Sequence, residues 1–125
     1  MKRWLVTLAL AACGSPPPSL QPVVRADAQL AATLSFVELT VLAKPTTCDA
    51  VTAAPLFMQN GLDPVATANL APTASQTFTA LARGSYVVVA EAFDASGTRV
   101  ARGCIEVAVG EKREVARATV VLHAL

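Results

Sequence analysis

From residue 33 onward the sequence is a series of short apolar runs that alternate with polar residues and end at turn residues. Alternation with a period of two puts every second side chain on the same face, which is typical of a half-buried β-strand. The runs are also rich in β-branched residues, which favour strands. We expect strands in the segments 37–41, 77–81, 86–93, 100–109 and 115–122. Short strands joined by turns predict an all-β fold, a small antiparallel β-sandwich over residues 33–125.

Two segments fit this pattern less well. Leu30, Leu34 and Val37 also recur at helical spacing, so a helical turn remains open in the alanine-rich part before Thr33. The middle segment, residues 46–72, contains three prolines and an Asn-Gly pair. We therefore expect one or two short strands there, embedded in long loops.

Residues 81–97 carry the most distinctive local pattern of the folded part. A Gly-x-Tyr pair, Gly84 and Tyr86, begins a run of small apolar residues, and Asp94-Ala95-Ser96-Gly97 ends it. This segment resembles a hairpin of immunoglobulin-like and transthyretin-like domains, above all carboxypeptidase-regulatory-like modules. The resemblance implies an immunoglobulin-like sandwich and no particular activity. It also implies that Tyr86 anchors the sheet while Asp94 and Gly97 reverse the chain.

The N-terminus has the organisation of a secretory signal. Met1-Lys2-Arg3 is a short basic segment, and residues 4–12 form an apolar run. As a helix this run would span roughly 14 Å, about half of the hydrocarbon core of a bilayer, which is too short for a membrane-spanning helix. Its length and position match the hydrophobic region of a cleaved leader. Cys13 follows this run, and one interpretation of the segment is an ordinary leader with a chance cysteine after it.

The apolar run ends in Leu10-Ala11-Ala12-Cys13, followed by Gly14. In this position a branched apolar residue, two small residues and a cysteine resemble the lipobox of bacterial lipoproteins. The resemblance implies that residues 1–12 are removed as a signal peptide and that Cys13 receives a diacylglyceryl group and further acylation, for example with palmitate. Two or three acyl chains hold a protein stably at a bilayer, so the expected partner is a membrane. Glycine rather than aspartate after the cysteine implies the cell outer membrane.

Residues 13–32 are expected to form a flexible tether between the lipid and the folded body. Ser15-Pro16-Pro17-Pro18-Ser19 and Pro22 favour the extended polyproline conformation, which has no internal hydrogen bonds. At about 3.1 Å per residue, the first ten positions would hold the body roughly 30 Å from the lipid headgroups. The expected organisation is a leader, a tether and one β-domain.

Two cysteines, Cys48 and Cys104, lie in the expected domain. A cysteine pair in an exported domain predicts a disulfide. One detail conflicts with it: if Ile105 and Val107 face the core, strict alternation turns Cys104 outward. Gly103 could mark a bulge that changes the facing.

Few residues offer catalytic chemistry. His123 is the one histidine, and the sequence holds no Gly-x-Ser-x-Gly, His-Glu-x-x-His or phosphate-binding glycine loop. The carboxylates are scattered, and Asp94 is interpreted as a turn residue rather than as a calcium ligand. We therefore expect no enzyme, no catalytic residue, no cofactor and no metal.

The charge balance excludes one class of partner. Without Lys2 and Arg3, which the leader would remove, eight basic residues face nine acidic ones. Binding to the phosphate backbone of nucleic acid needs a basic stripe, so we expect no nucleic-acid partner.

The leading hypothesis is a lipid-anchored, non-enzymatic β-sandwich that binds or scaffolds an envelope protein or glycan. The alternatives are a carbohydrate- or peptide-binding module, which needs an aromatic-lined concave patch, and a small envelope enzyme. Phe57, Met58 and Leu62 in the irregular middle segment are the first candidates for a binding surface, because loops on rigid scaffolds carry function. The alternative, which is the more frequent role of such residues, is that they close the end of the sandwich core. An edge strand could pair with a second chain, which leaves the oligomeric state open.

Overall fold

The computed structural model describes residues 18–43, 46–52, 56, 59, 61–72, 74–79, 81–110 and 115–125. The described part contains seven strands and two single-turn helices. The strands are β1 (Ser19–Arg25), β2 (Phe36–Ala43), β3 (Pro64–Leu70), β4 (Gly84–Phe93), β5 (Arg99–Val109), β6 (Val115–Val121) and β7 (His123–Ala124). The helices are α2 (Ala28–Ala31) and α3 (Cys48–Val51). Neither described helix has the length or the apolar content needed to cross a membrane.

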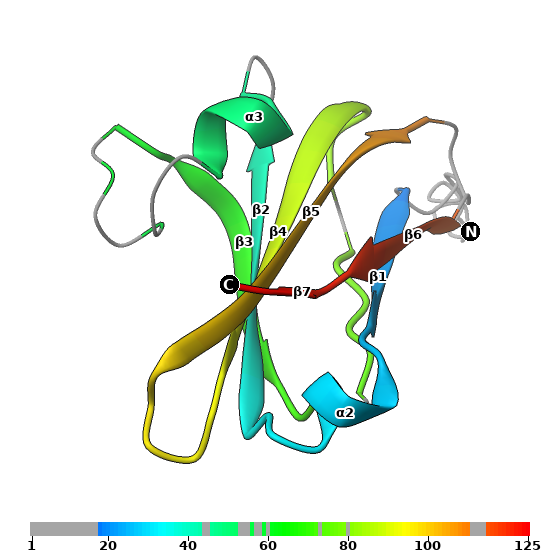
Figure 1. The fold of residues 1–125 in the computed structure, drawn as a ribbon. Helices are drawn as coiled ribbons and strands as arrows, with labels where there is room; N and C mark the ends of the chain where they lie inside the picture. The colour runs from blue at the N-terminus through cyan, green and yellow to red at the C-terminus, as the bar shows by residue number, and fades with distance from the viewer. Residues whose placement is uncertain are drawn as a thin grey trace, which may run out of the picture.

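The strands form a two-layer β-sandwich (Figure 1). One layer is a five-stranded antiparallel sheet in the order β3-β2-β4-β5-β7, and the other pairs β1 with β6. The expected all-β sandwich is confirmed. The helical turn left open before Thr33 is present as α2, and β3 is the short strand expected in the middle segment.

The main core lies between the two layers, on the side of the five-stranded sheet that we call the inner face. Alternate residues of β2 and β4 are fully or almost fully buried there: Val37, Leu39, Val41, Tyr86, Val88, Ala90 and Ala92. From the opposite layer, Leu20 and Val120 pack into the same cluster. The period of two in the sequence thus selects the residues whose burial drives folding.

The tether expected over residues 13–32 extends too far into the folded body. Residues 19–25 form β1, and Leu20 is fully buried and bridges to Phe78. Pro22 is tolerated because β1 has a continuous ladder on one side and only isolated bridges on the other. Burial of Leu20 against a distant part of the chain outweighs the polyproline preference of the local sequence.

The second sheet differs from the expected antiparallel arrangement, because β1 and β6 run parallel. Ser19 is opposite Val115 at one end of the ladder and Arg25 is opposite Val121 at the other. A parallel pair needs a long connection, and here the whole five-stranded sheet apart from β7 lies between the two strands in sequence.

The strand expected over residues 77–81 is reduced to isolated bridges. Phe78 pairs with Leu20, and Ser75 pairs with Val23. Phe78 and Leu81 are nevertheless buried in the main core, so the apolar character of this run reflects packing under the edge of β1 rather than membership of a sheet.

The hairpin between β4 and β5 has the expected form. The Asp94 carboxylate accepts hydrogen bonds from the backbone N–H groups of Ser96 and Thr98, both at 3.0 Å. Gly97 has a φ of +83°, a conformation that favours glycine. The Tyr86 hydroxyl donates to the backbone carbonyl of Ala82 and ties the start of β4 to the preceding loop.

Gly103 has a different role from the bulge considered for it. It pairs in register with Ala90, and the irregularity of this ladder lies between Ala92 and Phe93 instead. A Cβ atom at Gly103 would lie 2.3 Å from the backbone oxygen of Val121. Gly103 therefore provides the space in which the end of β6 crosses the five-stranded sheet.

Candidate functional site

The second side of the five-stranded sheet, which we call the outer face, carries both polar and apolar side chains. In one cross-strand row Asn69, Glu38, Glu91 and Arg102 are successive neighbours. In the next row Thr67 and Thr40 are followed by Val89 and Cys104. The first row is thus polar on all four strands, whereas the second changes from polar on β3 and β2 to apolar on β4 and β5.

A small apolar cluster lies between α3 and the outer face. Val51 of α3 packs there on Leu42 of β2 and on Val87 and Val89 of β4, and these four side chains are almost completely buried. Leu56 and Leu62 pack against the same cluster. We call α3 together with Leu56 and Leu62 the outer cover, because these residues lie over part of the outer face.

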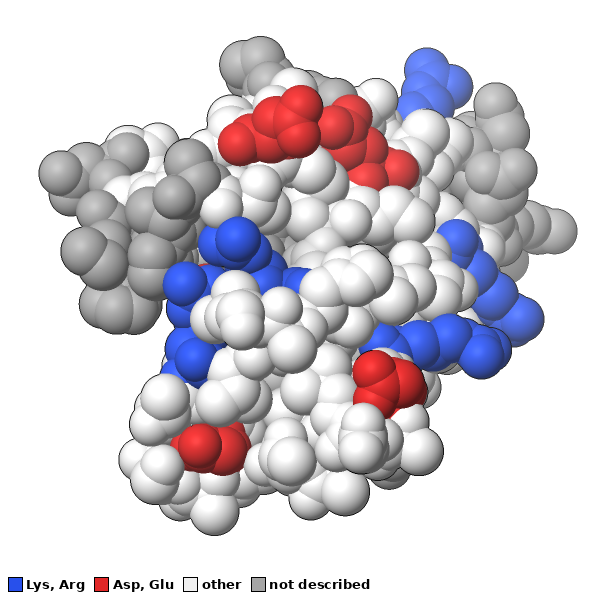
Figure 2. Space-filling model, in the orientation of Figure 1, with Lys and Arg blue, Asp and Glu red and all other residues white. Residues whose placement is uncertain are grey.

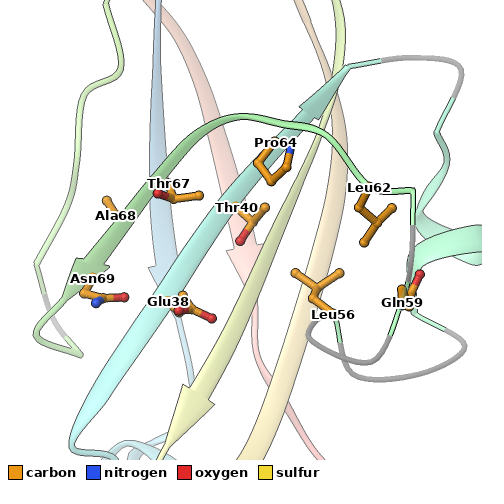
Figure 3. A pocket seen from close by; sticks show the side chains of 9 residues that line it. All are labelled: Glu38, Thr40, Leu56, Gln59, Leu62, Pro64, Thr67, Ala68 and Asn69. Carbon is orange, nitrogen blue, oxygen red and sulfur yellow. The ribbon is translucent and has the colours of Figure 1, made fainter.

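Between the outer cover and the polar residues of β2 and β3 lies a cavity of about 400 Å³, which we call the outer-face pocket (Figure 3). Its polar lining residues are Glu38, Thr40, Gln59, Thr67 and Asn69, and its apolar ones are Leu56, Leu62, Pro64 and Ala68. In Figure 3, Glu38 and Thr40 project from β2, while Leu56 and Leu62 come from the segment after α3. A concave site with a few convergent polar groups and apolar walls is the usual form of a small-molecule pocket.

Glu91 fixes one wall of the pocket. It is only 2 % exposed, and its carboxylate accepts hydrogen bonds from the Leu56 backbone N–H and from the Arg99 guanidinium, both at 3.3 Å. The contact with Arg99 is also an ion pair. A buried carboxylate without partners would be very unfavourable, and these two donors both compensate its charge and hold Leu56 at the pocket edge.

The disulfide attaches the α3 end of the outer cover to β5. Cys48 and Cys104 are bonded, with Cα atoms 5.8 Å apart. The backbone N–H of Cys48 also donates to the Glu106 carboxylate at 3.2 Å, and the Thr47 hydroxyl caps α3 by accepting from Ala50. The predicted disulfide is therefore present, and Cys104 does turn outward. The conflict disappears because the outer face has its own apolar cluster to receive it.

Two polar groups of the pocket have no internal partner. Neither the Glu38 carboxylate nor the Thr40 hydroxyl forms a hydrogen bond or an ion pair in the described structure. Thr40 is only 7 % exposed. Buried polar groups are normally satisfied, so an unsatisfied hydroxyl facing a cavity is a feature that needs a ligand or solvent.

Figure 2 shows charges of both signs on one side of the molecule. Acidic side chains gather near the top, around α3, basic side chains lie to the left and right below them, and further acidic groups lie lower on the same side. Asp49 is the exposed acidic residue in the first turn of α3. The acidic lining of the outer-face pocket is a separate feature, because Glu38 lies on β2.

The residues singled out in the sequence have different fates. Leu62 lines the outer-face pocket, whereas Phe57 and Met58 lie outside the described residues, as does Cys13 with the whole leader. His123 is exposed in β7 opposite Arg102, beside a smaller cavity of about 230 Å³.

Asp94 lies in the hairpin turn and away from the pocket. The hydrogen bond from the Ser96 side chain, together with that from the Thr98 backbone, lowers the pKa of the Asp94 carboxyl. These contacts stabilise the ionised form and account for Asp94 as a turn residue.

Metal binding and paired-carboxylate chemistry each require a particular arrangement of side chains. Within the described ranges, no group of three or more histidine, cysteine, aspartate or glutamate side chains is arranged to hold a metal ion. Of the two carboxylates that meet across β2 and β4, Glu91 is occupied by Arg99 and Leu56. A mechanism with paired carboxylates needs both groups to face the substrate.

Sequence reasoning missed the four polar residues of β2 and β3. In the sequence, Glu38 and Thr40 are simply the polar residues that alternate with the apolar residues of the strand expected over 37–41. Their partners Asn69 and Thr67 come from a segment expected to be irregular. Alternation of polar residues within 64–70 was the available signal, but the pairing register that joins the two strands is not readable from either one.

Comparison with known proteins gives no identity: no protein-family model, no curated protein and no solved structure matches the chain.

Proposed function

We propose that the protein is an exported lipoprotein, anchored to the bacterial outer membrane through lipid on Cys13, whose β-sandwich binds a small polar ligand without catalysing a reaction. The sandwich is proposed to be related to the immunoglobulin-like and transthyretin-like domains that its β4–β5 hairpin resembles. The observation that carries the proposal is the position of Cys13, directly after two small residues and an apolar run with a basic start.

The disulfide supports export. Disulfides persist in oxidising compartments such as the bacterial periplasm and are rare in the cytosol. The bond between Cys48 and Cys104 closes a separation of 56 residues and joins α3 to β5. A structural bond of this kind fits a protein that folds after crossing the inner membrane.

The outer-face pocket supports the binding role. It combines a cavity, an unpaired carboxylate and an unpaired buried hydroxyl on a rigid sheet. The described residues that line it include no aromatic side chain. The rings of Phe36 and Phe93 stack on each other with centroids 4.8 Å apart.

Mass spectrometry of the processed protein tests the anchor. The full chain is expressed in a Gram-negative host, and the N-terminal peptide is compared with that of the variant Cys13→Ser. We expect the native peptide to begin at Cys13 and to carry diacylglyceryl and acyl groups, and the variant to lose the lipid and leave the membrane fraction. A native chain with an unmodified Cys13, cut elsewhere or not at all, would refute the anchor.

The membrane assignment has its own test. The variant Gly14→Asp should move the lipoprotein from outer-membrane to inner-membrane fractions on a density gradient, with lipid still attached. An unchanged distribution, with the native protein in the inner membrane, contradicts the outer-membrane assignment.

A further inference from the structure

We propose that the outer-face pocket binds a primary ammonium group flanked by hydrogen-bonding groups, with the Glu38 carboxylate as its counter-charge. This inference rests on the binding role proposed above and names the class of ligand. It is argued from the charges, the buried hydroxyl and the shape of the pocket.

The described lining of the pocket carries a negative charge. Glu38 is the one charged residue among the described residues that line it. Its cross-strand neighbour is a second carboxylate, Glu91, whose charge is compensated by Arg99. Glu38 has no ion-pair partner in the described structure, so its charge favours a cation in the pocket over an anion.

The polar groups around Glu38 can hold atoms next to the ammonium. Thr40 lies two residues along β2 on the same face, and its buried hydroxyl has no partner in the described structure. On β3, Asn69 is opposite Glu38 and Thr67 is opposite Thr40. These hydroxyl and amide groups can donate and accept, so they suit hydroxyl or amide groups of a ligand.

The apolar wall limits the ligand to one with a hydrocarbon part. Leu56 and Leu62 face the polar strands across the pocket in Figure 3. The Glu91 carboxylate and the packing of both leucines on the α3 cluster hold this wall in place. A protonated amine on a ring or a short methylene chain fits all three requirements, and an amino sugar or a lysine-like side chain supplies it.

Isothermal titration calorimetry on the whole lipidated chain in non-ionic detergent tests the inference with two matched probe pairs. Glucosamine is compared with glucose, which has a hydroxyl in place of the ammonium. N-acetyl-lysinamide is compared with N-acetyl-norleucinamide, which keeps the four side-chain carbons and has a hydrogen atom in place of the ammonium. We expect at least one ammonium probe to bind at least 10-fold more tightly than its neutral partner. Preference for glucosamine identifies an amino sugar, and preference for the lysine derivative identifies a peptide amine.

Variants assign the binding to the pocket. Glu38→Gln should weaken the preferred ammonium probe at least 10-fold, and Thr40→Val should weaken it several-fold. Asp49→Asn removes an exposed carboxylate on α3 and should leave affinity unchanged. Thermal melting separates binding from folding, because Glu38→Gln removes a like charge beside Glu91 and should melt at or above the native temperature.

Equal binding of neutral and ammonium probes, full affinity in Glu38→Gln, or no binding of either ammonium probe overturns the ammonium inference. None of these outcomes affects the lipid on Cys13, which mass spectrometry measures separately. A lipidated protein that binds no amine therefore refutes the ligand class alone, and an unlipidated protein that binds one refutes the anchor alone.

Discussion

The inner and outer faces of the five-stranded sheet are made by alternate residues of the same strands, but they are stabilised in different ways. The inner face carries an apolar cluster that spans both layers. Leu39 and Val88 of this cluster are fully buried. The outer face carries a cluster of four buried residues and a row of polar groups beside it. Its cover is held by one disulfide and by the Glu91 carboxylate.

The difference indicates that inward-facing and outward-facing residues of the same strand have different roles. Residues facing inward exclude water and fix the fold, while residues facing outward on β2 and β3 leave polar groups without partners. Such groups lower stability, so they are expected where binding needs them. Substitutions on the two faces should therefore have effects of very different size.

The largest effect should come from the disulfide that holds the outer cover. Removing both cysteines in Cys48→Ala/Cys104→Ala releases a loop of 56 residues, for which chain entropy gives a loss of about 4 kcal/mol in unfolding free energy. Urea unfolding measures it, with Cys13→Ser as the control that keeps the bond. A loss below about 1 kcal/mol would show that the outer cover is stable without its covalent link.

Two adjacent residues of β2 compare the faces directly. Leu39→Ala opens a cavity in the inner core and should lower unfolding free energy by about 3 kcal/mol. Thr40→Val keeps the side-chain shape on the outer face and removes an unpaired buried hydroxyl, so the unfolding free energy should stay the same or rise by up to about 1 kcal/mol. Chemical denaturation of both variants is the measurement. Equal losses would contradict the distinction between the faces.

The crossing of β6 over β5 is tested by Gly103→Ala. The new methyl group would meet the Val121 backbone oxygen, and displacing that backbone should cost about 1–3 kcal/mol. Ala108→Val, on an exposed position of the same strand, is the control and should be nearly neutral. Thermal melts of the two variants decide the point; an unaffected Gly103→Ala protein would mean that the layers are not in such close contact.

The smallest effect should come from the hairpin turn, which belongs to neither face. The folded state lowers the pKa of Asp94, so the ionised Asp94 carboxylate stabilises the folded state. This stabilisation is complete above the ordinary aspartate pKa, about 3.9, and is lost as pH falls through the lower pKa of the folded state. Asp94→Asn should therefore lose less stability than the native chain between about pH 5 and pH 2. Melting curves at several pH values in this window test the sign, and a steeper loss in the variant would contradict it.

The sequence predicts most of the five-stranded sheet because alternation is a local signal. It places β2, β4, β5 and the Asp94 turn, and it identifies the bonded cysteines. It fails at β1, which follows three consecutive prolines and contains Pro22, because the decisive contact is between Leu20 and a cluster formed by distant strands. Local preference could not reveal that contact.

The candidate site was less accessible to prediction than the fold. Leu62, a candidate because of its irregular loop, does line the pocket, but Glu38 and Thr40 look like ordinary solvent-facing residues in one strand. Their significance depends on register, which brings Asn69 and Thr67 beside them, and on the Leu56 wall held by Glu91. These are tertiary relations, and no single segment encodes them.

The early start of β1 has a consequence for how the protein would stand on a membrane. With Cys13 as the attachment point, only residues 14–18 separate it from the sandwich, so the linker is at most roughly 20 Å long. The linker leads into β1 of the β1–β6 layer, whereas the outer-face pocket opens on the opposite side of the molecule. The body would thus stay close to the bilayer with its ligand entrance turned toward the surrounding compartment.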